Sequence, residues 1–188
     1  MVGMGFLQRV WPRLYRPGEG DRTLSEIFEV TVPGPGRLAV VERPRGGHWL
    51  ADDMATLRRG GVDTLISALP PREAATAHLA DEGSAAAAAG IDFVHFPIPN
   101  LLTPPLDEAV PVLTGLASRI RRGGFVGAHC FASQGRGPLI VASTMVLLGV
   151  DPDEAWLEVA TARRLDVPDT HLQRNWVAQL VLYRSLVH

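Results

Sequence analysis

A cysteine and an arginine six positions apart are the residues of this sequence whose types and spacing most clearly allow catalysis. They lie in FVGAHCFASQGRGPLIVAS, residues 125–143, where Cys130 is the only cysteine of the chain and Arg136 follows after five residues. A short apolar run, residues 125–129, precedes the cysteine, and residues 137–149 are apolar nearly all round, as in a buried helix. The pattern therefore predicts a strand, a loop and a helix, in that order.

The predicted loop has the properties of an anion-binding site. At the carboxyl edge of a parallel sheet, loop amides that lead into a helix point to one place and favour a negative ligand. Arg136 adds a permanent forked charge suited to two phosphate oxygens, and Gly135 allows the backbone to come close. The same field favours a thiolate at Cys130. The alternative is a buried, inert cysteine, but the spacing to Arg136 favours the anion-binding loop.

The motif HCFASQGR, residues 129–136, resembles the His-Cys-five residues-Arg signature of cysteine-dependent protein tyrosine and dual-specificity phosphatases. Residues 37–74 and 85–100 are similar to the segments before the active site in small bacterial dual-specificity-like members, so the resemblance covers about residues 37–180. It implies an α/β fold, a single domain with a central, mostly parallel sheet flanked by helices. Rhodanese-like sulfurtransferases also carry a cysteine in such a loop, but the arginine spacing and the long apolar helix favour the phosphatases.

The resemblance implies a two-step reaction that needs no metal or other cofactor. The Cys130 thiolate would attack phosphorus to form a cysteinyl-phosphate, which water would then hydrolyse. His129 would orient the loop. Phosphorylated proteins or small aryl phosphates are the expected substrates, because the loop side chains are neutral, which disfavours phosphoinositides and nucleotides. The residues expected to bind phosphate, through backbone amides and one guanidinium, are Phe131, Ala132, Ser133, Gln134, Gly135 and Arg136.

Two positions depart from the family pattern. Asn100 stands where the family has the aspartate that protonates the leaving oxygen, and an amide cannot replace that acid, whose help is typically worth 10²–10⁴-fold in rate. Asp107 is a candidate stand-in, although it also suits the first turn of a helix. Gly137 lacks the hydroxyl that assists the second step in many members, which predicts slow breakdown of the phospho-enzyme. Both departures keep a second function open: a pseudo-phosphatase that binds phosphorylated partners with little turnover.

Two further polar residues have a functional and a structural interpretation. Glu73 matches the family glutamate that supports the arginine loop, but it also suits a solvated helix start. Gln173 is able to face the site and position water, but its surroundings favour a glutamine on the surface of a helix.

The elements that must position these residues follow from the hydrophobic pattern. Apolar runs bounded by Gly and Pro predict strands within residues 26–44, 62–69, 91–98 and 125–129. Helical spacing predicts helices within residues 48–61, 73–90, 106–124, 137–149, 151–164 and 168–187. In the last of these, we expect an inward face formed by Leu172, Trp176, Leu180 and Tyr183. Strands that alternate with helices indicate a parallel sheet.

Length and composition set limits on the class of protein. The 188 residues suit one domain, expected over residues 21–188 after an N-terminal stub, residues 1–20. A net charge of −2 argues against nucleic-acid binding. The sequence has no run of about 18 apolar residues, the length that a transmembrane segment requires. A single cysteine suits a reducing compartment, so we expect a cytoplasmic protein. The stub has apolar residues at helical spacing with arginines between them, which predicts either packing on its own domain or contact with a partner or a membrane surface.

Overall fold

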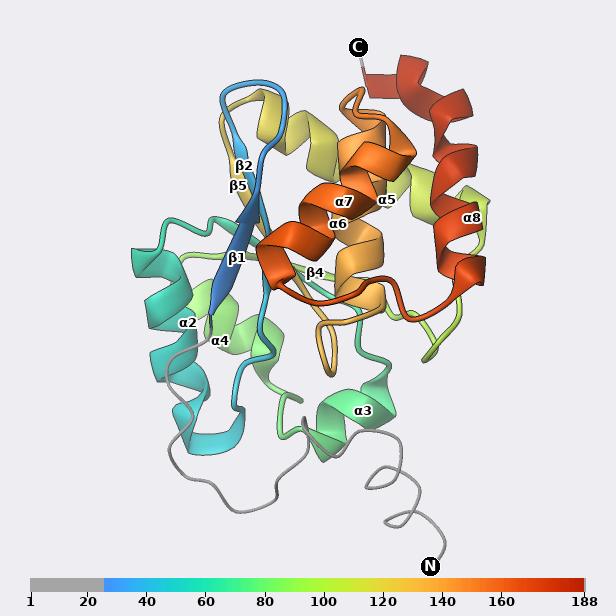
Figure 1. The fold of residues 1–188 in the computed structure, drawn as a ribbon. Coiled ribbons are helices and arrows are strands. Elements are labelled where there is room, and N and C mark those ends of the chain that lie inside the picture. Colours follow the sequence, from blue (N-terminus) through green and yellow to red (C-terminus); the bar gives the residue numbers. More distant parts are fainter. Residues whose placement is uncertain (1–25, 188) are drawn as a thin grey trace, which may run out of the picture.

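A five-stranded sheet forms the centre of the computed structural model, which describes residues 26–187. The strands lie in the order β1-β2-β5-β3-β4; β1 is antiparallel to β2, and the other neighbours are parallel. Strand β5 therefore lies in the middle of the sheet (Figure 1), which confirms the expected central, mostly parallel sheet. The strands are β1 (Ile27–Val30), β2 (Arg37–Val41), β3 (Thr64–Ser67), β4 (Asp92–His95) and β5 (Phe125–His129).

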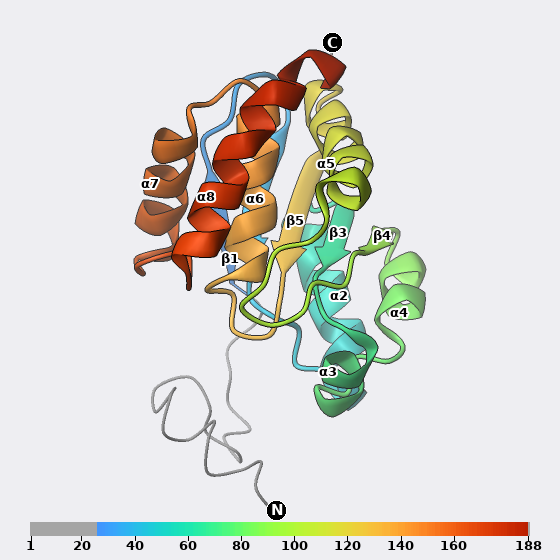
Figure 2. The same ribbon diagram turned by 90° about the vertical axis from the view of Figure 1, so that its right-hand side faces the viewer.

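Helices cover both faces of the sheet. Helices α2 and α4 lie on one face, and α5, α6, α7 and α8 lie on the other (Figures 1 and 2). The helices are η1 (Gly47–Trp49), α2 (Leu50–Arg59), α3 (Pro71–Thr76), α4 (Glu82–Ala88), α5 (Leu106–Arg121), α6 (Arg136–Leu147), α7 (Pro152–Arg163), α8 (His171–Gln179) and η2 (Leu180–Val187). Between residues 26 and 187, none of them combines the length and apolar character that crossing a membrane requires. The predicted stub, residues 1–20, lies outside the described residues.

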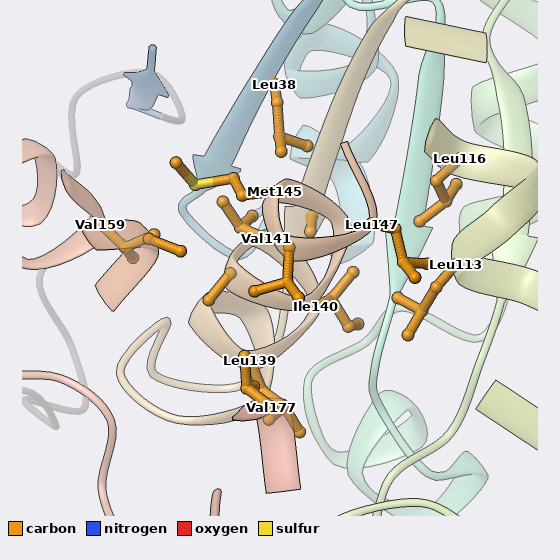
Figure 3. Close-up of a cluster of buried hydrophobic side chains, with 14 of the residues drawn as sticks. Leu38, Leu113, Leu116, Leu139, Ile140, Val141, Met145, Leu147, Val159 and Val177 are labelled. Carbon is orange, nitrogen blue, oxygen red and sulfur yellow. The ribbon is translucent and has the colours of Figure 1, made fainter. Parts of the chain in front are cut away.

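Helix α6 is buried along its whole length, as its uniformly apolar sequence predicted. Its side chains point in several directions, toward β2, α5, α7 and α8 (Figure 3). Packing on all sides leaves the helix little freedom to shift, because protein cores are close-packed. The start of α6, where Arg136 lies, is thus held in place relative to β5. The residues drawn around this helix include Leu38, Leu113, Leu116, Val159 and Val177.

The alanine-rich segment differs from its prediction as one helix within residues 73–90. It forms two short helices, α3 and α4, with a break at His78, which has a left-handed backbone at φ 57°. The break allows Leu79 to enter the core beneath α2, where it is almost fully buried. Burial of this leucine therefore outweighs the helix propensity of the alanines. As a result, Glu73 and Glu82 extend from separate helices.

The inward face of the last helical segment was predicted only in part. Trp176 and Leu180 are buried as expected, but Leu172 is 52% exposed and Tyr183 is only partly buried. Gln173 takes the inward position instead and has 0% exposure, so the expectation of a surface glutamine is wrong. The inward face is set by the loop and helix against which α8 packs, and apolar spacing alone did not identify it.

Candidate active site

The loop between β5 and α6 bends around Cys130 and Arg136. Cys130 directly follows β5 and is 2% exposed, while Arg136 is the first residue of α6 and is 3% exposed. Because β2, β3 and β5 run parallel, their carboxyl ends share one edge of the sheet. The thiol and the guanidinium thus lie where open α/β sheets bind ligands. The predicted order of strand, loop and helix is confirmed.

The guanidinium of Arg136 is held by two segments that are distant in sequence. Its Nη2 and Nη1 donate to Oε2 and Oε1 of Glu73 at 2.7 and 3.1 Å, and Nη1 also donates to the carbonyl of Ile98 at 3.0 Å. Glu73 therefore supports the arginine. This contact agrees with the functional interpretation of Glu73 and not with that of a solvated acid at a helix start. A forked arrangement of this kind fixes the plane of the guanidinium. The Nε–H and the second Nη2–H remain for a bound oxyanion, since arginine has five N–H donors.

The far side of the loop is braced at Ser133. This residue has a left-handed backbone, φ 55°, and its hydroxyl donates to the carbonyl of Val41 at 2.9 Å. Its own carbonyl accepts a bond from Nε of the buried Arg163 at 3.1 Å. Burial lowers the pKa of Arg163, and nearby negative charge, including that of a Cys130 thiolate, opposes the decrease. Arg163 thus joins α7 to the loop, a contact for which the sequence analysis had no expectation.

A buried ion pair lies behind the cysteine. Nε2 of His129 is 2.7 Å from Oε1 of Glu82, and both side chains are almost completely enclosed. The imidazole carries a charge in this pair only when it is protonated. His129 ends β5 and Cys130 follows directly, so Glu82 lies close to the strand end from which the loop starts, although the geometry of the contact is not that of a hydrogen bond. The sequence analysis did not identify Glu82, since it was expected inside a continuous helix.

One pocket opens above the loop, with a volume of about 320 Å³. The thiol of Cys130, the guanidinium of Arg136 and the side chain of Asn100 all line it, so the structure brings these three residues together. Ser133 and Gln134, the other loop residues expected to bind phosphate, do not line the pocket. The lining residues are Arg72, Glu73, Thr76, Asn100, Cys130, Phe131, Ala132, Gly135, Arg136 and Asp169.

The two candidate proton-transfer positions differ in their placement. Asn100 lines the pocket, at the end of the segment that follows β4. Asp107 lies exposed in the first turn of α5 and is not a lining residue. Its location matches the structural interpretation, in which an acid interacts with the helix dipole. A catalytic role for Asp107 stays a prediction from the sequence.

Two side chains contact the loop at Gly135: Asp169, which lies between α7 and α8, and Gln173, which lies in the first turn of α8. A Cβ added at Gly135 would lie 2.1 Å from Oδ2 of Asp169 and 3.1 Å from Nε2 of Gln173, so only glycine permits this approach. Partial burial raises the pKa of Asp169, and the positive charge of Arg136 opposes the increase. Asp169 was not predicted from the sequence, in which no spacing connects it with Cys130 or Arg136.

No protein-family model and no curated protein match the sequence. A kinase associated phosphatase, solved with serine in place of its catalytic-site cysteine, superposes with a TM-score of 0.78 and 17% identity over 89% of this chain and 98% of that chain. Tk-PTP in its active form gives a TM-score of 0.65 and 19% identity over 82% and 96%.

TpbA of P. aeruginosa, solved in complex with pTyr, gives a TM-score of 0.56 and 20% identity over 81% of this chain and 87% of that chain. These similarities show that the chain has the fold of the protein tyrosine and dual-specificity phosphatases. The fold implied by the HCFASQGR motif is thereby confirmed.

Proposed function

We propose that this protein is a cytoplasmic phosphatase that hydrolyses phosphomonoesters, preferably phosphotyrosine or similar aryl phosphates, through a cysteinyl-phosphate at Cys130. The observation that carries the proposal is the shared pocket of a thiol and a guanidinium fixed by Glu73 and Ile98. The phosphatase fold supports it. The single cysteine of the chain supports a reducing compartment.

In the first step, the sulfur of Cys130 attacks phosphorus and the bond from phosphorus to the leaving oxygen breaks. Arg136 and the backbone amides of residues 131–136 hold the remaining phosphate oxygens as charge moves toward the leaving group. In the second step, water attacks phosphorus, the bond between sulfur and phosphorus breaks, and inorganic phosphate leaves. Ser133 and Gln134 contribute through their amides in this proposal, since their side chains do not line the pocket.

The pocket wall favours an aryl group on the substrate. Phe131 lines the pocket, and the guanidinium of Arg43 lies over its ring, 4.3 Å from the centroid. The ring offers a flat apolar surface to a phenyl ester, and aromatic pairs of this kind add binding energy beyond the area they bury. Asn100 favours the same substrates, because a phenolate leaves more readily than an alkoxide when proton donation is weak.

A phospho-specific binding module is the second candidate function. Asn100 and Gly137 favour it, because the first lacks a proton to donate and the second lacks the hydroxyl that assists thiolate departure. Such a module would use the same loop to hold a phosphorylated partner without turnover.

Hydrolysis of p-nitrophenyl phosphate separates the two candidates. We expect the native chain to release phosphate with inhibition by vanadate, Cys130→Ser to be inactive, and Arg136→Ala to lose most activity. Arg122→Ala serves as the control, since Arg122 is exposed at the end of α5. If native protein and Cys130→Ser release phosphate equally slowly while both bind vanadate or phosphate, the binding module is the correct function.

Replacement of Asn100 by aspartate is a second test of the same site. A large rate increase would show that the segment after β4 closes over the substrate and lacks only its acid. An unchanged rate would show either that another group supplies the proton or that this segment does not close over the substrate.

A further inference from the structure

The pocket contains a carboxyl group at a position where the sequence analysis expected none. Asp169 precedes α8 by two residues and lines the same pocket as Cys130, Asn100 and Arg136. Its Oδ2 lies against Gly135 of the loop. The carboxyl therefore stands beside the place where a phosphate held by the loop would have its oxygens.

The structural alternative for Asp169 is a helix cap, and the contacts exclude it. The cap of α8 is Thr170, whose hydroxyl accepts a hydrogen bond from the backbone N–H of Gln173 at 3.2 Å. Across residues 26–187, no hydrogen bond or ion pair holds the Asp169 carboxyl. Asp169 is an exposed residue, so its carboxyl reaches both solvent and the pocket and is not tied to a structural partner.

The charged groups around the carboxyl set its proton affinity. The positive charge of Arg136 lowers the pKa of Asp169. The same pocket is also lined by Glu73 and Cys130, which carry negative charge as carboxylate and thiolate, and by Arg72, which carries positive charge. Partial burial outweighs Arg136, so the pKa of Asp169 is above its ordinary value. A proton donor works best when its pKa approaches the working pH, and the increase is in that direction.

We propose that Asp169 transfers the protons of the phosphatase reaction, in place of the acid absent at position 100. The proposal rests on the function proposed above. In the first step, Asp169 gives its proton to the leaving oxygen as that oxygen takes the electron pair of its bond to phosphorus. In the second step, the Asp169 carboxylate takes a proton from water as the water oxygen bonds to phosphorus, and sulfur leaves with its electron pair. Asp169 and Cys130 thus return to their starting states.

The test compares two aryl phosphates with leaving groups of different acidity. For Asp169→Asn, we expect kcat/KM on phenyl phosphate to fall about 100-fold or more, the range of general acid catalysis. The decrease on p-nitrophenyl phosphate should be much smaller, because nitrophenolate leaves without a proton. The decline of kcat at high pH that we expect for the native chain should also disappear. Asp166→Asn is the matched control, an aspartate on the same segment that is exposed, as Asp169 is, but does not line the pocket.

The possible outcomes separate the two proposals. Hydrolysis that requires Cys130 but shows the same leaving-group preference and pH profile in Asp169→Asn overturns the role of Asp169 alone. A native chain that does not hydrolyse either ester overturns the role of Asp169 together with the proposed function. Vanadate affinity and the circular dichroism spectrum are measured for each variant, so that a folding defect is not taken for loss of proton transfer. If Asp169→Asn fails to fold, the test is the preference of the native chain between the two esters. A strong preference for p-nitrophenyl phosphate, the ester with the better leaving group, overturns the role of Asp169 as proton donor.

Discussion

The ion pair between Glu73 and Arg136 allows a quantitative test of how the loop is organised. In Glu73→Gln, the amide oxygen still accepts the bond from Nη1, but the amide nitrogen faces Nη2, where a 2.7 Å charge-assisted bond existed. Loss of one hydrogen bond to a charged group costs about 1.5–3 kcal/mol. The third contact, to the carbonyl of Ile98, is unchanged. The guanidinium therefore stays in the pocket but loses the fork that fixes its plane.

Two effects of this change act in opposite directions on the enzyme. The misaligned guanidinium stabilises the transition state less well, and 1.5–3 kcal/mol corresponds to roughly a 10- to 100-fold lower kcat. Removal of the Glu73 charge, however, makes the pocket more positive, which favours binding of a phosphate dianion. We expect the orientation effect to appear in kcat and the charge effect to keep KM close to its native value.

Steady-state hydrolysis of p-nitrophenyl phosphate, together with urea unfolding, measures both quantities for Glu73→Gln. Glu108→Gln is the control, because Glu108 is also a first-turn acid of a helix but is exposed and outside the pocket. A kcat for Glu73→Gln equal to that of the control would refute the view that this ion pair orients Arg136. A rise in KM with unchanged kcat would refute the assignment of its effect to the transition state.

Three further predictions concern the loop and its neighbours. Gly135→Ala places a methyl 2.1 Å from the Asp169 carboxyl, so we expect hydrolysis to fall because the carboxyl is displaced, while stability in urea unfolding changes little because the end of an exposed side chain can move away. In Gly137→Ser, the added Cβ meets its nearest neighbours at 3.5 Å, so the variant should fold normally. Its hydroxyl should assist the second step, so the pre-steady-state burst that we expect in the native chain should shrink. The raised pKa of Asp169 means that its contribution to stability is present at low pH and is lost as pH rises through the folded pKa. Asp169→Asn should therefore match the native chain in urea unfolding near pH 3 and exceed it at about pH 7, and equal differences at both values would contradict this.

Much of the fold could be predicted from sequence because its elements carry local signals. Strand β5, before the loop, is a short apolar run that follows two glycines, and helix α6, after the loop, is apolar all round. The predictions that were wrong concern features that depend on tertiary packing. A left-handed residue at His78 splits the alanine-rich segment, and Gln173 displaces Leu172 from the inward face of α8. Neither the helix break nor the inward position of Gln173 follows from hydrophobic periodicity, because each depends on the part of the fold against which the segment packs.

The sequence alone determined the candidate active-site segment of this protein. Cys130 and Arg136 are close enough in the chain for one strand, one loop and one helix start to place them together, and local rules predict all three. Only the tertiary structure decided which groups surround them. Glu73, Arg163 and Asp169 reach the loop from α3, α7 and the segment before α8, across 63 residues in the case of the bond from Arg136 to Glu73. Contacts over such separations depend on how the sheet and helices pack, and no spacing within the chain encodes them.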